Sequence, residues 1–237
     1  MRSRRYTVFK QLALGLFAAS VLAACGSLDA NKANIRVVHA SPDAGTVDIY
    51  VNDTALVTGA VYTQATPFSQ FTQGNLTIKV CAAGTTNCPI NTTLKADPGK
   101  YYTVLAIGSL AGGTLEALVA ADDRTAPSIA NQFKLRVIHA APAATPVDVY
   151  VTAPTAVLGS TGNTAAIYDL AYKSITTPYI GVPSGSYRFR ITAAGTQNVV
   201  IDSGTTGFPM VAGKTYTAIA VNPVAGVTNG LILLIDN

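Results

Sequence analysis

The sequence contains one motif twice, and this internal repeat constrains the fold more than any other feature of the chain. Residues 35–51 read IRVVHASPDAGTVDIYV and residues 135–151 read LRVIHAAPAATPVDVYV, so the second copy follows the first by 100 positions without a gap. A repeat this long indicates two copies of one structural module. We therefore expect a first module at residues 35–121, a linker at 122–134 and a second module at 135–237.

Each repeat is built from short runs rich in β-branched residues, separated by turn residues. Only 8% of the chain is aromatic and 12% is charged, while 49% is hydrophobic, a composition that fits strands better than long amphipathic helices. Runs spaced by roughly ten residues, about seven in a repeat, are typical of a β-sandwich. The sequence predicts an all-β protein with two tandem immunoglobulin-like β-sandwich modules.

Two further features concern the tyrosines and the lengths of the repeats. The segments that end in Tyr102 and Tyr216, each preceded by a glycine three positions earlier, resemble the tyrosine corner, in which a tyrosine hydroxyl bonds to nearby backbone. The second repeat is also longer, mostly within residues 152–184. Insertions lie in loops, so any difference between the partners of the two modules is expected there.

The N-terminus predicts export and a lipid anchor. Residues 1–24 contain four basic and no acidic residues, and their apolar run at 12–24 is too short for a permanent membrane span, so they predict a signal peptide. The sequence LAACG around Cys25 resembles the bacterial lipobox, in which Cys25 becomes the first mature residue and carries acyl chains such as palmitate. Two or three chains anchor a protein stably.

The anchor predicts where the protein is located. Residues 25–34 are then a polar tether on a lipoprotein of the bacterial cell envelope. Glycine and serine follow Cys25, without the aspartate that retains many lipoproteins at the inner membrane, so the outer membrane is favoured if the source is Gram-negative. The alternative is an ordinary secretory peptide with a chance cysteine.

The charge of the mature protein argues against nucleic acid as a partner. The chain has 16 basic and 12 acidic residues, but four of the basic residues lie in the signal peptide. The remainder is balanced at 12 of each sign, which gives no basic surface for phosphate binding.

Cys81 and Cys88 are separated by a loop-like AAGTTN segment. In an oxidising compartment this spacing predicts a disulfide across a hairpin. A metal site is the alternative, but no histidine or third cysteine lies nearby. We expect no metal and no cofactor.

The two histidines occupy the same place in each repeat. If each repeat begins with a hairpin, His39 lies opposite Asp48 and His139 opposite Asp148, as structural hydrogen-bonded pairs. The alternatives are a general base with its orienting carboxylate, or an ion site. Ser41 and Asp43 become alanines in the second repeat, so neither a shared serine nucleophile nor a shared ion site is expected.

Other candidate residues also allow two interpretations. Asp122 and Asp123 form either a solvated linker or an interdomain cation site. Three tyrosines either pack as ordinary core or surface residues of strands or form an exposed platform on which sugar rings stack: Tyr168, Tyr172 and Tyr179. Glu116 is the only glutamate, which argues against a pair of catalytic carboxylates, and no common hydrolase or phosphate-binding motif occurs.

The duplicated block resembles a bacterial and archaeal family called domain of unknown function 4397. The resemblance covers nearly all of the mature chain and rests on these matched residues: Arg36, His39, Ala40, Pro42, Val47, Asp48 and Tyr50 with Arg136, His139, Ala140, Pro142, Val147, Asp148 and Tyr150. It implies secreted or surface-attached sandwich modules, often in tandem, and no established activity.

These observations predict a cell-envelope lipoprotein whose two modules serve binding, adhesion or envelope structure without catalysis. The expected partners are a membrane, through Cys25, and a surface glycan or an envelope protein. A glycan-binding module is the alternative within this class. The rival from another class is a hydrolase that uses a His–Asp pair in each repeat.

Overall fold

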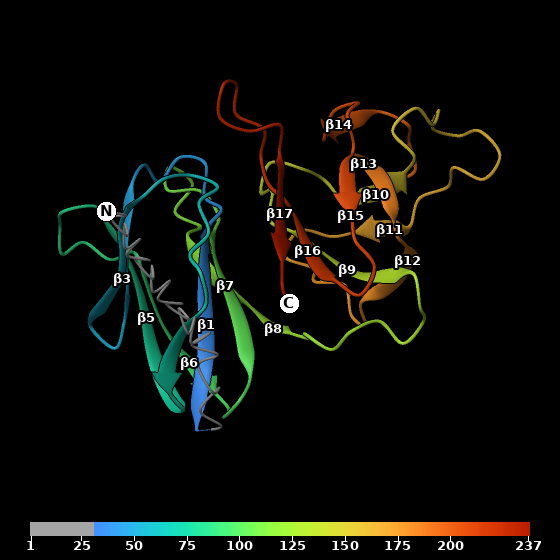
Figure 1. Ribbon diagram of the computed structural model, residues 1–237. Helices are drawn as coiled ribbons and strands as arrows, with labels where there is room; N and C mark the ends of the chain where they lie inside the picture. The colour runs from blue at the N-terminus through green and yellow to red at the C-terminus, as the bar shows by residue number, and fades with distance from the viewer. Residues whose placement is uncertain (1–30) are drawn as a thin grey trace, which may run out of the picture.

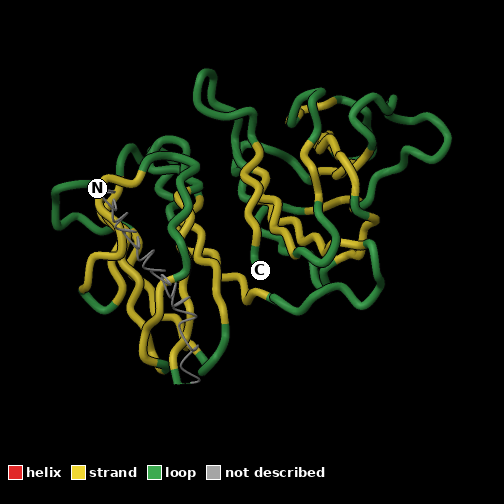
Figure 2. Tube along the Cα trace, viewed as in Figure 1, coloured by secondary structure: helices red, strands yellow, loops and turns green. Residues whose placement is uncertain are grey.

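The computed structural model describes residues 31–237, which form two β-sandwiches in tandem (Figure 1). Figure 2 shows strands and loops throughout this part of the chain, with no helix. Residues 31–237 accordingly contain no helix of the length and apolarity needed to cross a membrane.

Module one consists of eight strands in two four-stranded sheets, with orders β4-β1-β7-β8 and β3-β2-β5-β6. All neighbours are antiparallel except β1 and β7, which are parallel. The strands are β1 Lys32–His39, β2 Val47–Val51, β3 Thr54–Ala60, β4 Ser69–Thr72, β5 Gly74–Ala82, β6 Ile90–Ala96, β7 Tyr101–Ile107 and β8 Glu116–Asp122.

Module two repeats this arrangement, with sheet orders β12-β9-β16-β17 and β11-β10-β13-β14. The last strand of its second sheet is split, so that β13 pairs with β14 near one end and with β15 near the other. The strands are β9 Gln132–His139, β10 Val147–Thr152, β11 Ile167–Leu170, β12 Ile180–Pro183, β13 Gly185–Ala193, β14 Val199–Asp202, β15 Phe208–Met210, β16 Thr215–Ala220 and β17 Leu231–Ile235.

The prediction of an all-β protein with two tandem sandwiches is confirmed. Module one has eight strands rather than about seven, and β1 lies beside β7 instead of forming a hairpin with β2. The tyrosine corners are also confirmed. The backbone N–H of Asp97 donates to the Tyr102 hydroxyl at 3.1 Å, and that of Val211 donates to the Tyr216 hydroxyl at 3.0 Å.

The sheets that contain β1 and β9 are buried on both faces. Alternate residues of β1, such as Ile35 and Val37, pack in the core of module one, while Val38 packs in a separate cluster shared with module two. Because side chains alternate along a strand, one face of each of these sheets covers its own core and the other faces the neighbouring module. The two modules therefore pack sheet against sheet.

The shared cluster between the modules is aliphatic. Its residues come from both halves of the chain and are Val38, Ala40, Leu105, Ile107, Ala120, Ile138, Ala140, Ile219, Val221 and Ile232. Eight of these residues are 0% exposed: Ala40, Ala140 and the six larger residues Val38, Leu105, Ile107, Ile138, Ile219 and Val221. An apolar contact buried to this extent holds the two modules together, as a hydrophobic core does, and does not act as a flexible hinge.

Beside this cluster, two buried ion pairs connect the modules. Arg36 on β1 donates to Asp236, just after β17, at 2.6 Å. Reciprocally, Arg136 on β9 pairs with Asp122 at the end of β8. Thr103 on β7 and Thr217 on β16 occupy equivalent positions in the two modules. Each hydroxyl lies between the arginine and the aspartate of its own module.

The expectation of a solvated linker is wrong for Asp122. Its side chain is 0% exposed and lies between the guanidinium groups of Arg136 and Arg36. Burial raises the pKa of Asp122, and the two arginines oppose that shift. The cation-site alternative fails for the same reason, since these arginines supply the positive charge. Asp123 is different: its carboxylate pairs with Lys134 and is 45% exposed.

Candidate functional site

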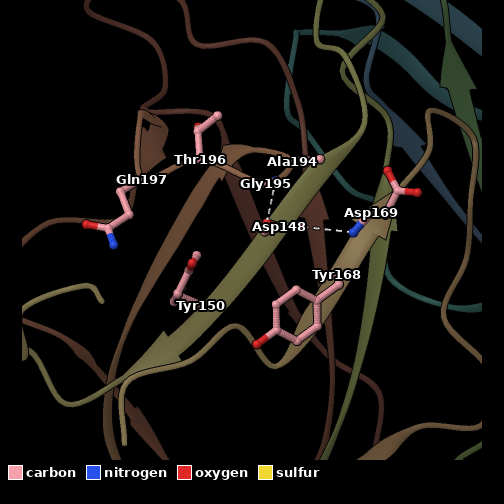
Figure 3. Close-up of a pocket in the computed structure, with 8 residues that line it drawn as sticks. All are labelled: Asp148, Tyr150, Tyr168, Asp169, Ala194, Gly195, Thr196 and Gln197. Atoms are coloured by element: carbon pink, nitrogen blue, oxygen red, sulfur yellow. Dashed lines mark hydrogen bonds between the residues drawn. The ribbon is translucent and has the colours of Figure 1, made fainter. Parts of the chain in front are cut away.

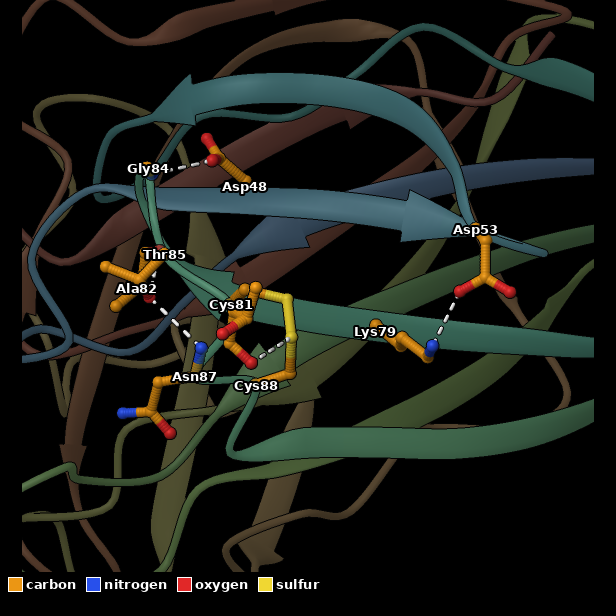
Figure 4. Close-up of a disulfide and its surroundings, with 10 residues drawn as sticks. Asp48, Asp53, Lys79, Cys81, Ala82, Gly84, Thr85, Asn87 and Cys88 are labelled. Atoms are coloured by element: carbon orange, nitrogen blue, oxygen red, sulfur yellow. Dashed lines mark hydrogen bonds and ion pairs between the residues drawn. A yellow bond between two sulfur atoms is a disulfide. The ribbon is translucent and has the colours of Figure 1, made fainter.

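The predicted disulfide is confirmed. Cys81, near the end of β5, and Cys88, just before β6, are joined across the loop that connects these strands (Figure 4). A thiol metal site is therefore excluded at this place. No group of three or more potential metal ligands occurs among residues 31–237.

The predicted His39–Asp48 and His139–Asp148 pairs are wrong. The prediction assumed that the first two strands of each repeat form a hairpin, but β1 and β2 belong to different sheets, and so do β9 and β10. The connection between them is an arch from one sheet to the other. The histidine and the aspartate therefore have separate partners.

Both histidines brace this arch through the backbone. The N–H of Ser41 donates to Nδ1 of His39 at 3.4 Å, so the proton of the neutral ring lies on Nε2, which donates to the Gly45 carbonyl at 2.8 Å. His139 makes the same two contacts at 3.3 Å, with Ala141 and Thr145. Both side chains are 0% exposed, so neither ring reaches solvent or a substrate.

Burial lowers the pKa of both histidines, and the hydrogen bonds to the Gly45 and Thr145 carbonyls oppose the shift. The unfolded chain binds protons at these rings below pH about 6.5, whereas the folded protein resists protonation until a lower pH. The neutral histidines therefore make their full contribution to the free energy of unfolding above pH about 6.5. This contribution falls as the pH decreases, by at most about 1.4 kcal/mol per pH unit for each histidine.

This pH dependence can be measured by urea unfolding at pH 7.5 and 5.5. We expect a lower free energy of unfolding at pH 5.5 and a weaker dependence in a His39→Gln, His139→Gln double variant. Equal stability of the natural protein at both pH values would contradict the assignment of neutral, buried imidazoles.

The duplicated aspartates hold two loops in place. Asp148 accepts the backbone N–H of Asp169 at 2.8 Å through one oxygen and that of Gly195 at 2.9 Å through the other. Asp48 does the same with Gly59 at 2.7 Å and Gly84 at 2.8 Å, and these bonds, first the one from Gly84, lower the pKa of Asp48. These carboxylates are therefore structural anchors for the loop tips above the second sheet.

The anchored loops of module two border an open hollow with a volume of about 590 Å³ (Figure 3). Its floor and rim come from β10, β11 and the loop between β13 and β14. The residues around it are Asp148, Tyr150, Tyr168, Asp169, Ala194, Gly195, Thr196 and Gln197. Gly195 has φ +71°, a conformation that glycine adopts without strain, and this directs its N–H toward Asp148.

Of the three tyrosines proposed as a stacking platform, the structure places one at this hollow. Tyr168 is 62% exposed and lines it. Tyr172 instead packs edge-on against His139, at 6.0 Å between ring centroids. Tyr179 lies under the Arg136 guanidinium, 4.9 Å from the ring centroid, and its hydroxyl donates to Asp236. The last two tyrosines belong to the structural framework.

Module one has a smaller and different hollow at the equivalent place, with a volume of about 330 Å³. Tyr50, Asp53, Lys79 and the disulfide surround it. Lys79 and Asp53 form an ion pair at 2.5 Å, which neutralises both charges (Figure 4). The repeats therefore differ at this surface.

The role of the duplicated aspartates was missed by sequence reasoning, although a signal was present. The tetrapeptide AAGT occurs at residues 82–85 and again at 193–196. Each copy contains the glycine that donates to the aspartate of its own repeat. The expectation that the modules differ within residues 152–184 did identify the segment that carries Tyr168 and Asp169.

Comparison with known proteins identifies a family. The family profile described as "Domain of unknown function (DUF4397)" matches residues 33–150 and again residues 134–237. A search of curated proteins finds no match. One similar solved chain is the "Crystal structure of CBMbc (family CBM26) from Eubacterium rectale Amy13K in Complex with Maltoheptaose", at 8% identity over 86% of this chain and 97% of that chain, with a TM-score of 0.27. That TM-score is too low to transfer a fold or a ligand.

Proposed function

The chain belongs to the DUF4397 family, and from this premise we propose that it is a non-catalytic binding protein of the cell envelope whose second module binds a glycan in the hollow beside Tyr168. Cys25 precedes the described residues, so its lipidation and the membrane location remain predictions from the sequence. The proposal for the hollow does not depend on them.

The observation that carries the proposal is the exposed ring of Tyr168 beside polar side chains on braced loops. An aromatic face stacks on the apolar C–H face of a sugar ring, while amide, hydroxyl and carboxylate groups bind its hydroxyls. Thr196, Gln197 and Asp169 provide such groups around Tyr168. The hollow is open, as a site for part of a long polymer must be.

The hydrolase alternative receives no support from the geometry. A general base must reach the proton that it removes, either directly or through one water molecule. His39 and His139 are 0% exposed, and both nitrogens of each ring contact backbone groups. Their duplication is explained by the arch that each one braces.

A titration with and without the Tyr168 ring tests the proposal. We expect the purified protein to bind at least one oligosaccharide from a panel of envelope and extracellular glycans. Tyr168→Ala should weaken this binding by about tenfold or more, because it removes the stacking surface, whereas Tyr168→Phe should retain most of it. Val157→Ala is a suitable control, since Val157 is 69% exposed in the same module but does not line the hollow.

Two results would refute the proposal. One is the absence of binding to every glycan of the panel at millimolar concentration. The other is glycan binding that Tyr168→Ala leaves unchanged, which would locate the site elsewhere on the protein.

A further inference from the structure

The outer sheet of module two contains a buried cation without a carboxylate partner. Arg190 on β13 is 6% exposed, and its Nη2 donates to the Thr152 hydroxyl at 2.6 Å. Its Nε has no hydrogen-bond partner. The ion pairs recorded among residues 31–237 do not include Arg190.

In module one, the cation at the equivalent position has a carboxylate partner from the chain itself. Lys79 lies opposite Tyr50 in the strand register, just as Arg190 lies opposite Tyr150. Lys79 pairs with Asp53 at 2.5 Å. The residue of module two that corresponds to Asp53, 100 positions later, is Ala153. Module two therefore keeps the cation and lacks its carboxylate.

The acidic residue opposite Arg190 on the same sheet already pairs with another arginine. Asp202 lies opposite Arg190 in the register of β13 and β14, but its two oxygens accept from Nε and Nη2 of Arg188, at 2.8 and 2.5 Å. Burial, and after it the positive charge of Arg188, lowers the pKa of Arg190. A buried cation in this state reduces the stability of the fold, because it has lost water without gaining an opposite charge.

Arg190 lies next to the floor of the hollow. Tyr150, directly opposite Arg190, is one of the residues around the hollow. Thr192, opposite Asp148, is 0% exposed, and its hydroxyl also has no partner. A guanidinium whose Nε is unpaired and an unpaired hydroxyl thus lie two residues apart on the outer face of β13, next to the hollow.

A loop runs from the Arg188 end of the strand toward the hollow. The Pro154 carbonyl accepts from Nη1 of Arg188 at 3.3 Å, and Gly159 lies against the side chain of Gln197, which borders the hollow. Residues 154–159 therefore pass along the outer face of β13 from Arg188 to the rim. They contain no strand.

We propose that Arg190 binds a carboxylate of the glycan, so that module two selects acidic sugars such as uronic acids. This inference rests on the function proposed above. The ligand would take the place that Asp53 has beside Lys79. A planar guanidinium binds a carboxylate through two parallel hydrogen bonds, and Nε together with a terminal nitrogen forms one such pair of donors. The Thr192 hydroxyl provides a further donor beside it.

The test compares uronate oligosaccharides with the same oligosaccharides after methyl esterification, which removes the charge and keeps the sugar. The full-length protein should bind the acidic form about tenfold or more tightly than the ester, with an affinity that decreases at high salt. Arg190→Met should make the two forms bind equally. Ala153→Asp, which restores the internal carboxylate, should also abolish the preference.

Thermal unfolding of the same variants separates this role from a structural one. Both variants should raise the unfolding midpoint, since Arg190→Met removes the uncompensated buried charge and Ala153→Asp pairs it with a carboxylate. A lower midpoint for Arg190→Met together with an unchanged preference would overturn the inference. Equal binding of acid and ester by the natural protein would also overturn it and leave glycan binding intact, whereas failure to bind any glycan would remove both proposals.

Discussion

Replacing Asp122 with alanine is expected to lower the free energy of unfolding by about 3–5 kcal/mol, because the change leaves the buried guanidinium group of Arg136 without its carboxylate partner. The Asp122 side chain is 0% exposed and contacts Arg136 and Arg36 from the two modules. Urea unfolding followed by tyrosine fluorescence measures the effect. Asp236→Ala should cost a similar amount, since Asp236 holds the reciprocal place in module two.

The adjacent residue provides a matched control. Asp123 also forms an ion pair, with Lys134, but its side chain is 45% exposed. Exposed pairs contribute little, so Asp123→Ala should cost less than about 1 kcal/mol. If Asp122→Ala were as mild as Asp123→Ala, the ion pairs would not hold the modules together, and the aliphatic cluster alone would have to do so.

This contact makes the tandem repeat a single structural unit. Each module alone would expose one face of the sheet containing β1 or β9, including side chains such as Leu105 and Ile219 that are 0% exposed in the whole protein. Exposed aliphatic surface of this kind is unfavourable in water. The hollows lie on the other sheet of each module, so packing between the modules leaves them free.

The features that the sequence predicted correctly are encoded locally. The strand runs, the tyrosine corners and the disulfide each depend on residues within about ten positions of one another, where spacing and turn chemistry are informative. The pairings of Asp122 with Arg136 and of Asp236 with Arg36 are different, because they depend on how two sheets meet. One signal was present: Arg36 interrupts an otherwise apolar strand, IRVVHA, and continuous apolar runs indicate strands buried on both faces.

The errors at the histidines have one cause. A turn-like segment, SPDAGT, was interpreted as a hairpin between the strands on either side of it, whereas it is the arch between two sheets. Turn residues mark a change of chain direction but do not say which strand lies beside which. The position of Asp148 beside Gly195 follows instead from the pairing of β10 with β13, which the local pattern does not contain.

Replacing Asp148 with alanine is expected to weaken glycan binding by about tenfold or more, even though the Tyr168 ring remains, because the carboxylate fixes both loops that border the hollow. The backbone N–H groups of Asp169 and Gly195 would lose their acceptor, and stability should fall by about 3 kcal/mol. Calorimetric titration with the glycan that binds the natural protein measures the first effect, and urea unfolding measures the second.

Asp48→Ala is the control that links this effect to one module. Asp48 braces the equivalent loops of module one through Gly59 and Gly84, so the variant should destabilise that module and leave glycan binding unchanged. Loss of binding in Asp148→Ala but not in Asp48→Ala would assign the site to module two. Full binding by a folded Asp148→Ala protein would show that the braced loops do not form the site, and the glycan would have to contact a different surface.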